Sequence, residues 1–233
     1  MQIDFHTHVL PDVDDGSQSV KESLDMLDAL CAQGVDLAVA TPHFYSNKTS
    51  LDAFLERRNK AFDLLCAARE ERKPKLLSGA EVRFFRGIGE ADRLAELCIA
   101  DTNVLLLEMP FAQWGRGEIA ELHRVLDRGI TPVIAHIERY ISFQKDLAPF
   151  NEIINLPVFA QVNAEALLQR RTRKFVLRLI DHGFSVLLGT DCHNMKRRRP
   201  DMDAGREVLL RKFGPDCLEK IDALGAQLLK IKE

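Results

Sequence analysis

Short apolar runs recur along the whole chain and alternate with segments that have helical spacing. The apolar runs span Ile3 to Phe5, Leu37 to Ala40, Lys75 to Leu77, Val104 to Leu107, Pro132 to Ala135, Val158 to Val162 and Ser185 to Leu188. The helical segments include Ser19 to Gln33, Leu51 to Glu71, Glu118 to Arg128, Ala164 to His182 and Met202 to Lys212. This pattern predicts seven strands that alternate with helices.

The character of these runs indicates how the strands pair. Strands that are apolar throughout and lie about 30 residues apart favour parallel pairing through right-handed crossovers. Seven such units are more typical of a β/α barrel than of an open sheet, although a doubly wound open sheet is the competing architecture. We therefore expect an α/β protein with a single domain over residues 1–233.

Composition and charge exclude several classes of protein. The 32 Lys and Arg residues nearly balance the 35 Asp and Glu residues, so we expect no nucleic-acid partner. No apolar stretch approaches the ~20 residues of a membrane-spanning helix, and the start MQIDFHTH lacks the features of a signal peptide. The 5 cysteines form no CxxC pair and outline neither a disulfide framework nor a zinc knuckle. We expect a cytoplasmic protein without direct membrane insertion.

Potential metal ligands gather where six of the seven predicted strands end. In parallel β/α folds these ends meet on one face. His6 and His8 lie two apart on an extended segment, so their side chains point the same way. The other strand ends contain His43, Glu81, Glu108, His136, Asp191 and His193. A single strand-end histidine is more often a packed imidazole, but five of them beside carboxylates that are costly to bury unpaired favour bound metal ions.

Other polar residues are less decisive. The loop from Leu10 to Gly16 contains three aspartates, which are either ligands or part of a solvated cap for the next helix. His123 and His182 fall within predicted helices, away from the strand ends, and receive no role.

Seven motifs carry a family resemblance. In order along the chain they are HTHVLPDVDDG, TPH, GAE, LLLEMP, PVIAHIERY, QVN and GTDCHN. Together they resemble the PHP (polymerase and histidinol phosphatase) superfamily, and within it the bacterial tyrosine phosphatases of capsule and exopolysaccharide synthesis (CpsB/CapC). The resemblance implies a distorted seven-stranded, TIM-like β/α barrel that binds three divalent metal ions. The implied ligands are His6, His8, Asp15, His43, Glu81, Glu108, His136, Asp191 and His193.

The resemblance also divides these ligands among the ions. One ion would bind His6, His8, Glu81 and Asp191, a second Glu81, Glu108 and His136, and a third Asp15, His43 and His193. Manganese is favoured by the resemblance, while iron, cobalt and zinc also suit nitrogen and oxygen ligands. The carboxylates offset about four of the roughly six positive charges, which leaves a site suited to a phosphate dianion. A water between two ions would have its pKa lowered toward about 7 and provide a bridging hydroxide for attack on phosphorus.

Two arginines are implied as phosphate-binding catalytic groups. One is Arg139, for which the alternative is an ion pair with Glu138. The other belongs to the run from Lys196 to Pro200 and is placed at Arg198. Because the family tends to have a glycine where this chain has an arginine at position 197, the choice between Arg198 and its two neighbours stays open.

Phosphotyrosine is the substrate that the resemblance implies, on a membrane-associated bacterial tyrosine kinase that controls capsule or exopolysaccharide synthesis. A histidinol-phosphate phosphatase and a phosphodiesterase are alternatives within the superfamily, and a non-catalytic kinase-docking module is another. Oligomeric state stays open. Aromatic residues that follow strand ends are either a mouth for the phosphotyrosine ring or core packing. They are Phe44, Tyr45, Trp114 and Tyr140.

Cys192 suggests a rival mechanism. It is spaced from Arg198 as C-x5-R, as in cysteine-dependent tyrosine phosphatases, which act through a thiolate. Such a loop binds phosphate with successive backbone amides and requires small residues, whereas the intervening residues are bulky and include no glycine. This mechanism would also leave the other candidate ligands unexplained, so the sequence favours metal-dependent hydrolysis.

Overall fold

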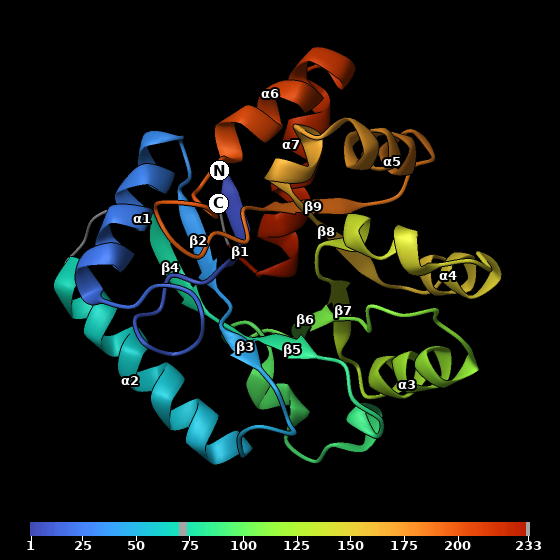
Figure 1. The fold of residues 1–233 in the computed structure, drawn as a ribbon, viewed down its shortest axis with the longest axis horizontal. Coiled ribbons are helices and arrows are strands. Elements are labelled where there is room, and N and C mark those ends of the chain that lie inside the picture. The colour runs from blue at the N-terminus through green and yellow to red at the C-terminus, as the bar shows by residue number, and fades with distance from the viewer. Residues whose placement is uncertain (70–73, 232–233) are drawn as a thin grey trace.

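The computed structural model describes residues 1–69 and 74–231, in which parallel strands form the centre and helices surround them (Figure 1). The strands are β1 (Ile3–Thr7), β2 (Leu37–Ala40), β3 (His43–Phe44), β4 (Lys75–Ser78), β5 (Glu81–Arg83), β6 (Val104–Glu108), β7 (Thr131–Ile134), β8 (Phe159–Asn163) and β9 (Val186–Gly189). The α-helices are α1 (Val20–Ala32), α2 (Leu51–Arg69), α3 (Arg116–Asp127), α4 (Ala148–Ile154), α5 (Arg170–Asp181), α6 (Met202–Phe213) and α7 (Pro215–Leu228). The expected α/β class and parallel pairing are confirmed.

Two of the predicted strands extend further than expected and are interrupted. After β2 the chain leaves the strand at Thr41 and Pro42 and resumes as β3, and after β4 it leaves at Gly79 and Ala80 and resumes as β5. Proline has no amide hydrogen to donate to a neighbouring strand, which favours a break at position 42. The described residues therefore form two sheets, with orders β1-β2-β4 and β3-β5-β6-β7-β8-β9, rather than the single closed sheet of seven strands that was expected.

Backbone hydrogen bonds join the two sheets where β1 meets the segment after β9. The amide of Asp191 donates to the carbonyl of His6 (2.7 Å), and the amide of His8 donates to the carbonyl of Cys192 (2.9 Å). A Cβ on Gly189 would lie 2.7 Å from the Cβ of His6, so glycine is what allows β9 to approach β1 this closely. The carboxyl ends of the first and last strands are therefore neighbours.

Most predicted helices are present with small shifts. Ser19 caps α1 by accepting a hydrogen bond from the amide of Glu22 (3.2 Å). The segment predicted as one helix from residue 164 to 182 divides into a 3-10 turn (Ala164–Leu167) and α5. The predicted end of the second helix at Glu71 lies outside the described residues. The sequence pattern did not predict α4 and α7.

Two hydrophobic clusters occupy the two sides of the strands. The outer cluster lies between strands and helices, and the inner cluster includes Phe5, Val39, Leu106, Val133 and Leu187, contributed by strands all around the centre. Helix α7 packs on the inner cluster, because a Cβ on its Gly225 would lie 3.2 Å from Cδ1 of Ile3. The amino ends of the strands are thus sealed by apolar packing. No helix of the described residues is long and apolar enough to cross a membrane.

Candidate metal centre

An irregularity in β1 changes the direction in which its side chains point just before the site. Ile3 and Phe5 belong to the inner cluster, so in a regular strand the next side chain, His6, would point to the other face. The register of β1 on β2 shifts between Asp4 and Thr7, as at a β-bulge. As a result His6 and His8 both point into the rim at the carboxyl ends of the strands, with their Nε2 atoms 3.0 Å apart.

Glu81, the first residue of β5, lies at the centre of the rim. Its Oε1 is 2.8 Å from Nε2 of His136, and its Oε2 is 2.8 Å from Nδ1 of His43. The Nε2 atoms of His6 and His8 lie 3.3 and 3.4 Å from the same Oε2. Burial by itself would raise the pKa of Glu81, but the surrounding histidines outweigh it and hold that pKa well below the usual range. Four imidazoles from three strand ends thus converge on one carboxylate.

Two predicted ligands have a strained backbone. His136 (φ 32°) and Asp191 (φ 53°) lie two residues after the ends of β7 and β9, and both have left-handed backbone conformations. Such a conformation costs a non-glycine residue about 1–3 kcal/mol and persists only where surrounding contacts hold it. Here it turns the His136 imidazole and the Asp191 carboxylate into the rim, where Asp191 Oδ1 lies 3.5 Å from His6 Nε2.

The potential ligand atoms form three groups in the described residues, and within each group they all lie within 4.8 Å of one another. The groups are His8, Asp15, His43 and His193; His6, His8 and Glu81; and His43, Glu81 and Glu108. The resemblance had placed His136, not His43, with Glu81 and Glu108. His136 Nε2 lies 3.9 Å from Oε1 of Glu108, so the geometry brings both histidines to this pair of carboxylates.

The rim has the properties expected of a divalent metal centre. Two of its buried polar atoms, Oε2 of Glu108 and Nδ1 of His136, have no hydrogen-bond partner among the described residues. Burial and the negative charge of Glu81 raise the pKa of Glu108, a cost that a nearby cation would relieve. A donor set of imidazoles and carboxylates fits manganese, iron, cobalt or zinc.

The acidic loop contributes two aspartates with different contacts. Asp15 has a side chain that is 67% exposed, and its Oδ1 lies 3.5 Å from Nε2 of both His43 and His193. A hydrogen bond with His193 lowers the pKa of Asp15 to about 2. A Cβ on Gly16 would lie 2.3 Å from the carbonyl oxygen of His8, so glycine allows this loop to fold back onto the strand end.

Asp14 is a site residue that the sequence did not identify. Its Oδ2 lies 2.6 Å from Nδ1 of His8 and accepts a hydrogen bond from the amide of His43 (2.9 Å). The side chain is only 7% exposed. The carboxylate therefore orients one imidazole and fixes the backbone that carries another, in the manner of carboxylates that support metal-binding histidines. Asp15 was the aspartate that the resemblance implied as a ligand. Only the contact with His8 shows that Asp14 also belongs to the site.

The QVN motif supports the site from β8. Gln161 Oε1 lies 2.9 Å from Nδ1 of His6 and accepts a hydrogen bond from the amide of His136 (2.8 Å). Asn163 Nδ2 donates to Oδ2 of Asp191 (3.0 Å). Alternation along the strand, with Gln161 and Asn163 on one face, was the available signal for these roles.

Comparison with known proteins adds independent information. The family model for capsular polysaccharide synthesis proteins, CpsB/CapC, matches residues 2–229. The chain belongs to the CpsB/CapC family. It is 28% identical to tyrosine-protein phosphatase CpsB of Streptococcus agalactiae (serotype III, strain NEM316) over 97% of this chain and 96% of that protein. It is 27% identical to tyrosine-protein phosphatase YwqE of Bacillus subtilis over 92% of this chain and 86% of that protein.

A solved structure of the same family matches the fold. It is described as belonging to YwqE from Bacillus subtilis and CpsB from Streptococcus pneumoniae, unique metal-dependent tyrosine phosphatases. The match has a TM-score of 0.84 at 25% identity and covers 100% of this chain and 96% of the other. The resemblance that the seven motifs indicated is thereby confirmed.

Two arginines of this CpsB/CapC chain converge on Asp191. Arg139 Nη2 donates to Oδ2 (2.6 Å), and Arg198 Nη2 lies 2.7 Å from Oδ1. The alternative ion pair of Arg139 with Glu138 does not form within 4 Å in the described residues. Within the arginine run, Arg197 and Arg199 are exposed, and only Arg198 lies in an ion pair. Both arginines that point to Asp191 line a cavity of about 170 Å³.

For three of the four aromatic residues, core packing rather than an aromatic mouth is the alternative that the structure shows. Phe44, Trp114 and Tyr140 are at most 4% exposed and pack in the outer cluster. Tyr45 is only partly buried and stacks on the His43 ring at 5.1 Å between centroids, while the buried Tyr140 ring lies 5.6 Å from the His136 ring. Phe111, which the sequence did not indicate, stacks on the His136 ring at 5.9 Å.

Cys192 does not have the environment of a nucleophile. Its side chain is fully buried, and burial raises the pKa of the thiol well above the ordinary value. A reactive cysteine requires an accessible, stabilised thiolate. The geometry therefore disfavours the thiolate mechanism.

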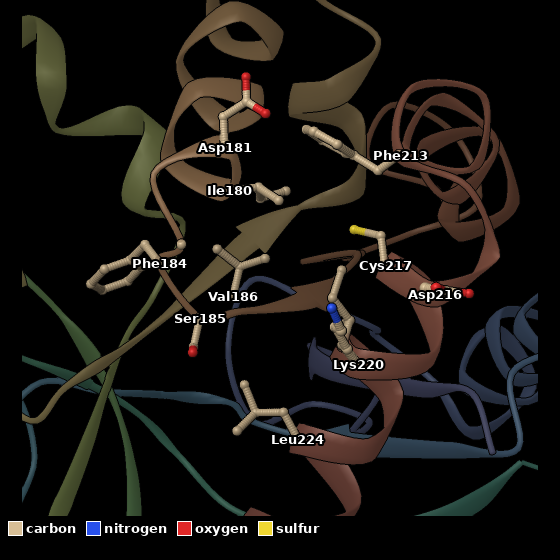
Figure 2. A pocket seen from close by; sticks show the side chains of 12 residues that line it. Ile180, Asp181, Phe184, Ser185, Val186, Phe213, Asp216, Cys217, Lys220 and Leu224 are labelled. Atoms are coloured by element: carbon tan, nitrogen blue, oxygen red, sulfur yellow. The ribbon is translucent and has the colours of Figure 1, made fainter.

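The cavity in Figure 2 lies at the other end of the strands. It has a volume of about 570 Å³ and is lined by Ser185 and Val186 at the start of β9, and by residues such as Phe213, Cys217 and Lys220 around the start of α7. None of the candidate metal ligands lines it. We assign it no part in the chemistry.

Proposed function

We propose that this chain is a metal-dependent protein-tyrosine phosphatase that hydrolyses phosphotyrosine on a membrane-associated bacterial tyrosine kinase of capsule or exopolysaccharide synthesis. The observation that carries the proposal is the convergence of five histidines and four carboxylates on one rim of a CpsB/CapC chain. Relatives of the family are named tyrosine-protein phosphatases. With such a substrate, the chain would act in the cytoplasm.

We assign the nine clustered side chains as ligands of three divalent ions, with manganese as the expected metal. The three groups of ligand atoms and the unpaired buried polar atoms support this assignment. The hydrogen bonds between the segment after β9 and β1 likewise support a distorted seven-stranded barrel, in which β2 with β3 and β4 with β5 each count as one interrupted strand.

The residues of the chain would bind and orient the phosphoryl group. Divalent ions at this centre supply Lewis-acid polarisation and an activated water. Arg139 and Arg198 approach Asp191 through different oxygens, so both guanidinium groups are in place to donate to phosphate oxygens beside it. Asp14 and Gln161 hold the imidazoles of His8 and His6 in fixed orientations.

Metal analysis combined with substrate assays tests the proposal. Purified protein should contain manganese or another divalent metal, hydrolyse a phosphotyrosine peptide, lose that activity to a chelator and regain it with added metal. Histidinol phosphate and DNA ends are assayed in parallel, because preference for either would favour another PHP-type reaction.

Two variants distinguish the metal mechanism from the thiolate mechanism. Glu81→Gln should lower both metal content and activity, because Glu81 contacts four candidate ligands. Cys192→Ser should keep activity, because its thiol is buried. Activity that resists chelation and disappears in Cys192→Ser would contradict the metal mechanism, and no turnover by metal-loaded protein would favour a docking module.

A further inference from the structure

Another cavity borders the ligand cluster, and it is lined by different residues from the cavity that contains the two arginines. It has a volume of about 520 Å³ and is lined by Asp15 and His43 from the cluster and by Tyr45, Lys48 and Arg57 beyond it. The arginine cavity shares Asp191 with the same cluster. The candidate metal centre therefore borders both cavities, and a peptide bound at the centre has the wider one within reach.

The carboxylates of the wider cavity contact neighbouring protein groups, whereas its cations form no ion pairs among the described residues. Its carboxylates face the histidines: Asp14 contacts His8 and the backbone of His43, and Asp15 lies 3.5 Å from two imidazoles. Its cations Lys48 and Arg57 are exposed, and neither lies within 4 Å of a carboxylate among the described residues. Asp15 is exposed as well, but its carboxylate faces two imidazoles, whereas no carboxylate of the described residues pairs with Lys48 or Arg57.

Tyr45 connects the cavity to the ligand cluster. Its ring stacks on His43 with an interplanar angle of 28°, and Nζ of Lys48 lies 4.3 Å from its centroid. The guanidinium carbon of Arg83 lies 5.7 Å from the same centroid. The ring therefore sits between a candidate ligand and two cations, which places the positive charge directly beside the site of the reaction.

We propose that this cavity binds the peptide segment next to the phosphotyrosine, and that Lys48 and Arg57 bind an anionic side chain there. The inference rests on the proposed phosphatase function and adds a preference to it. A carboxylate and a second phosphate share the necessary chemistry. Because the cations are exposed, the preference would be modest and would weaken as salt increases.

Matched phosphotyrosine peptides test the preference. One has glutamine residues on both sides of the phosphotyrosine, two have glutamates on the amino or the carboxyl side, and one has a phosphoserine neighbour. Wild-type enzyme should hydrolyse at least one anionic peptide with a kcat/KM about fivefold higher than the glutamine peptide, through a lower KM. The glutamate and phosphoserine peptides distinguish a carboxylate from a phosphate as the anion.

The double variant Lys48→Gln/Arg57→Gln should remove this ratio and its salt dependence, and leave hydrolysis of free phosphotyrosine unchanged. Its matched control is Arg171→Gln/Lys174→Gln, the same change of net charge at exposed positions of α5, across the molecule from α2 (Figure 1). The control should keep the ratio. An equal ratio in wild type and in the Lys48/Arg57 variant would overturn the inference and leave the phosphatase proposal intact, whereas failure of wild type on every peptide would contradict the phosphatase proposal itself.

Discussion

The amino ends of the strands are packed with apolar side chains, whereas their carboxyl ends contain buried ionisable side chains. At the amino ends, the inner cluster and α7 form apolar packing, with Phe5 1% and Leu106 0% exposed. At the carboxyl ends, buried histidines and carboxylates crowd one rim, two of them on strained backbone. One end contributes stability through burial, while the other places charges that are costly to bury where chemistry requires them. Substitutions at the two ends should therefore change different measurements.

The largest change in stability is expected from the apolar end. Leu106→Ala should lower the free energy of unfolding by about 2–5 kcal/mol, because it removes a fully buried side chain and leaves a cavity. Urea denaturation of metal-free protein measures this. Leu210→Ala, on a side chain 44% exposed, should stay within about 0.5 kcal/mol of wild type. Equal losses of unfolding free energy in the two variants would contradict the role of the buried amino-end cluster in stability.

At the rim, the largest effect should be on turnover. Arg139→Lys keeps a positive charge but loses the forked donors, and loss of such a donor typically costs ~3 kcal/mol, or about 100-fold in kcat. Steady-state kinetics with a phosphotyrosine peptide measures it. Arg197→Lys, at an exposed position, should keep nearly the wild-type kcat. A kcat of Arg139→Lys close to wild type would remove that arginine from the proposed machinery.

A substitution of Asp14 tests whether the hydrogen bond that orients His8 contributes to metal affinity. Asp14→Asn should weaken metal binding about 10–100-fold, because the hydrogen bond that orients His8 loses its charge. Titration of metal-free protein with manganese, followed by calorimetry, measures the affinity, and circular dichroism checks the fold. Asp12→Asn, an exposed aspartate in the same loop, is the control. An unchanged affinity for Asp14→Asn would show that the contact is only structural.

The smallest effect concerns pH. Burial, followed by the charge of Glu165, raises the pKa of Asp201 to about 7. Deprotonation is therefore more costly in the folded protein, so its contribution to stability declines as pH rises from about 4 through about 7. Asp201→Asn should gain about 1 kcal/mol over wild type at pH 8 and nothing at pH 4. The gain is smaller than the full pKa shift would give, because the side chain is only partly buried and solvent screens its charge. Denaturation at both pH values measures this, and a difference independent of pH would contradict it.

The sequence by itself determined the positions of the strands, the order of strand and helix, and the residues that reach the rim. These could be predicted because apolar periodicity marks the strands and parallel strands bring their carboxyl ends to one face. The same logic placed His6, Glu81 and Asp191 together although they are far apart in the chain. The family motifs then supplied the expected chemistry, and the comparisons confirmed the family.

Only the tertiary structure decided the rest. The bulge that turns His6 inward, the contact between Asp14 and His8, and the packing of α7 against the strands all depend on distances between segments that no local pattern specifies. Which arginine of the run reaches Asp191, here Arg198, depends equally on the fold. A pattern of residue types identifies potential ligands, but the orientation of each side chain is set by packing and hydrogen bonds across the whole fold.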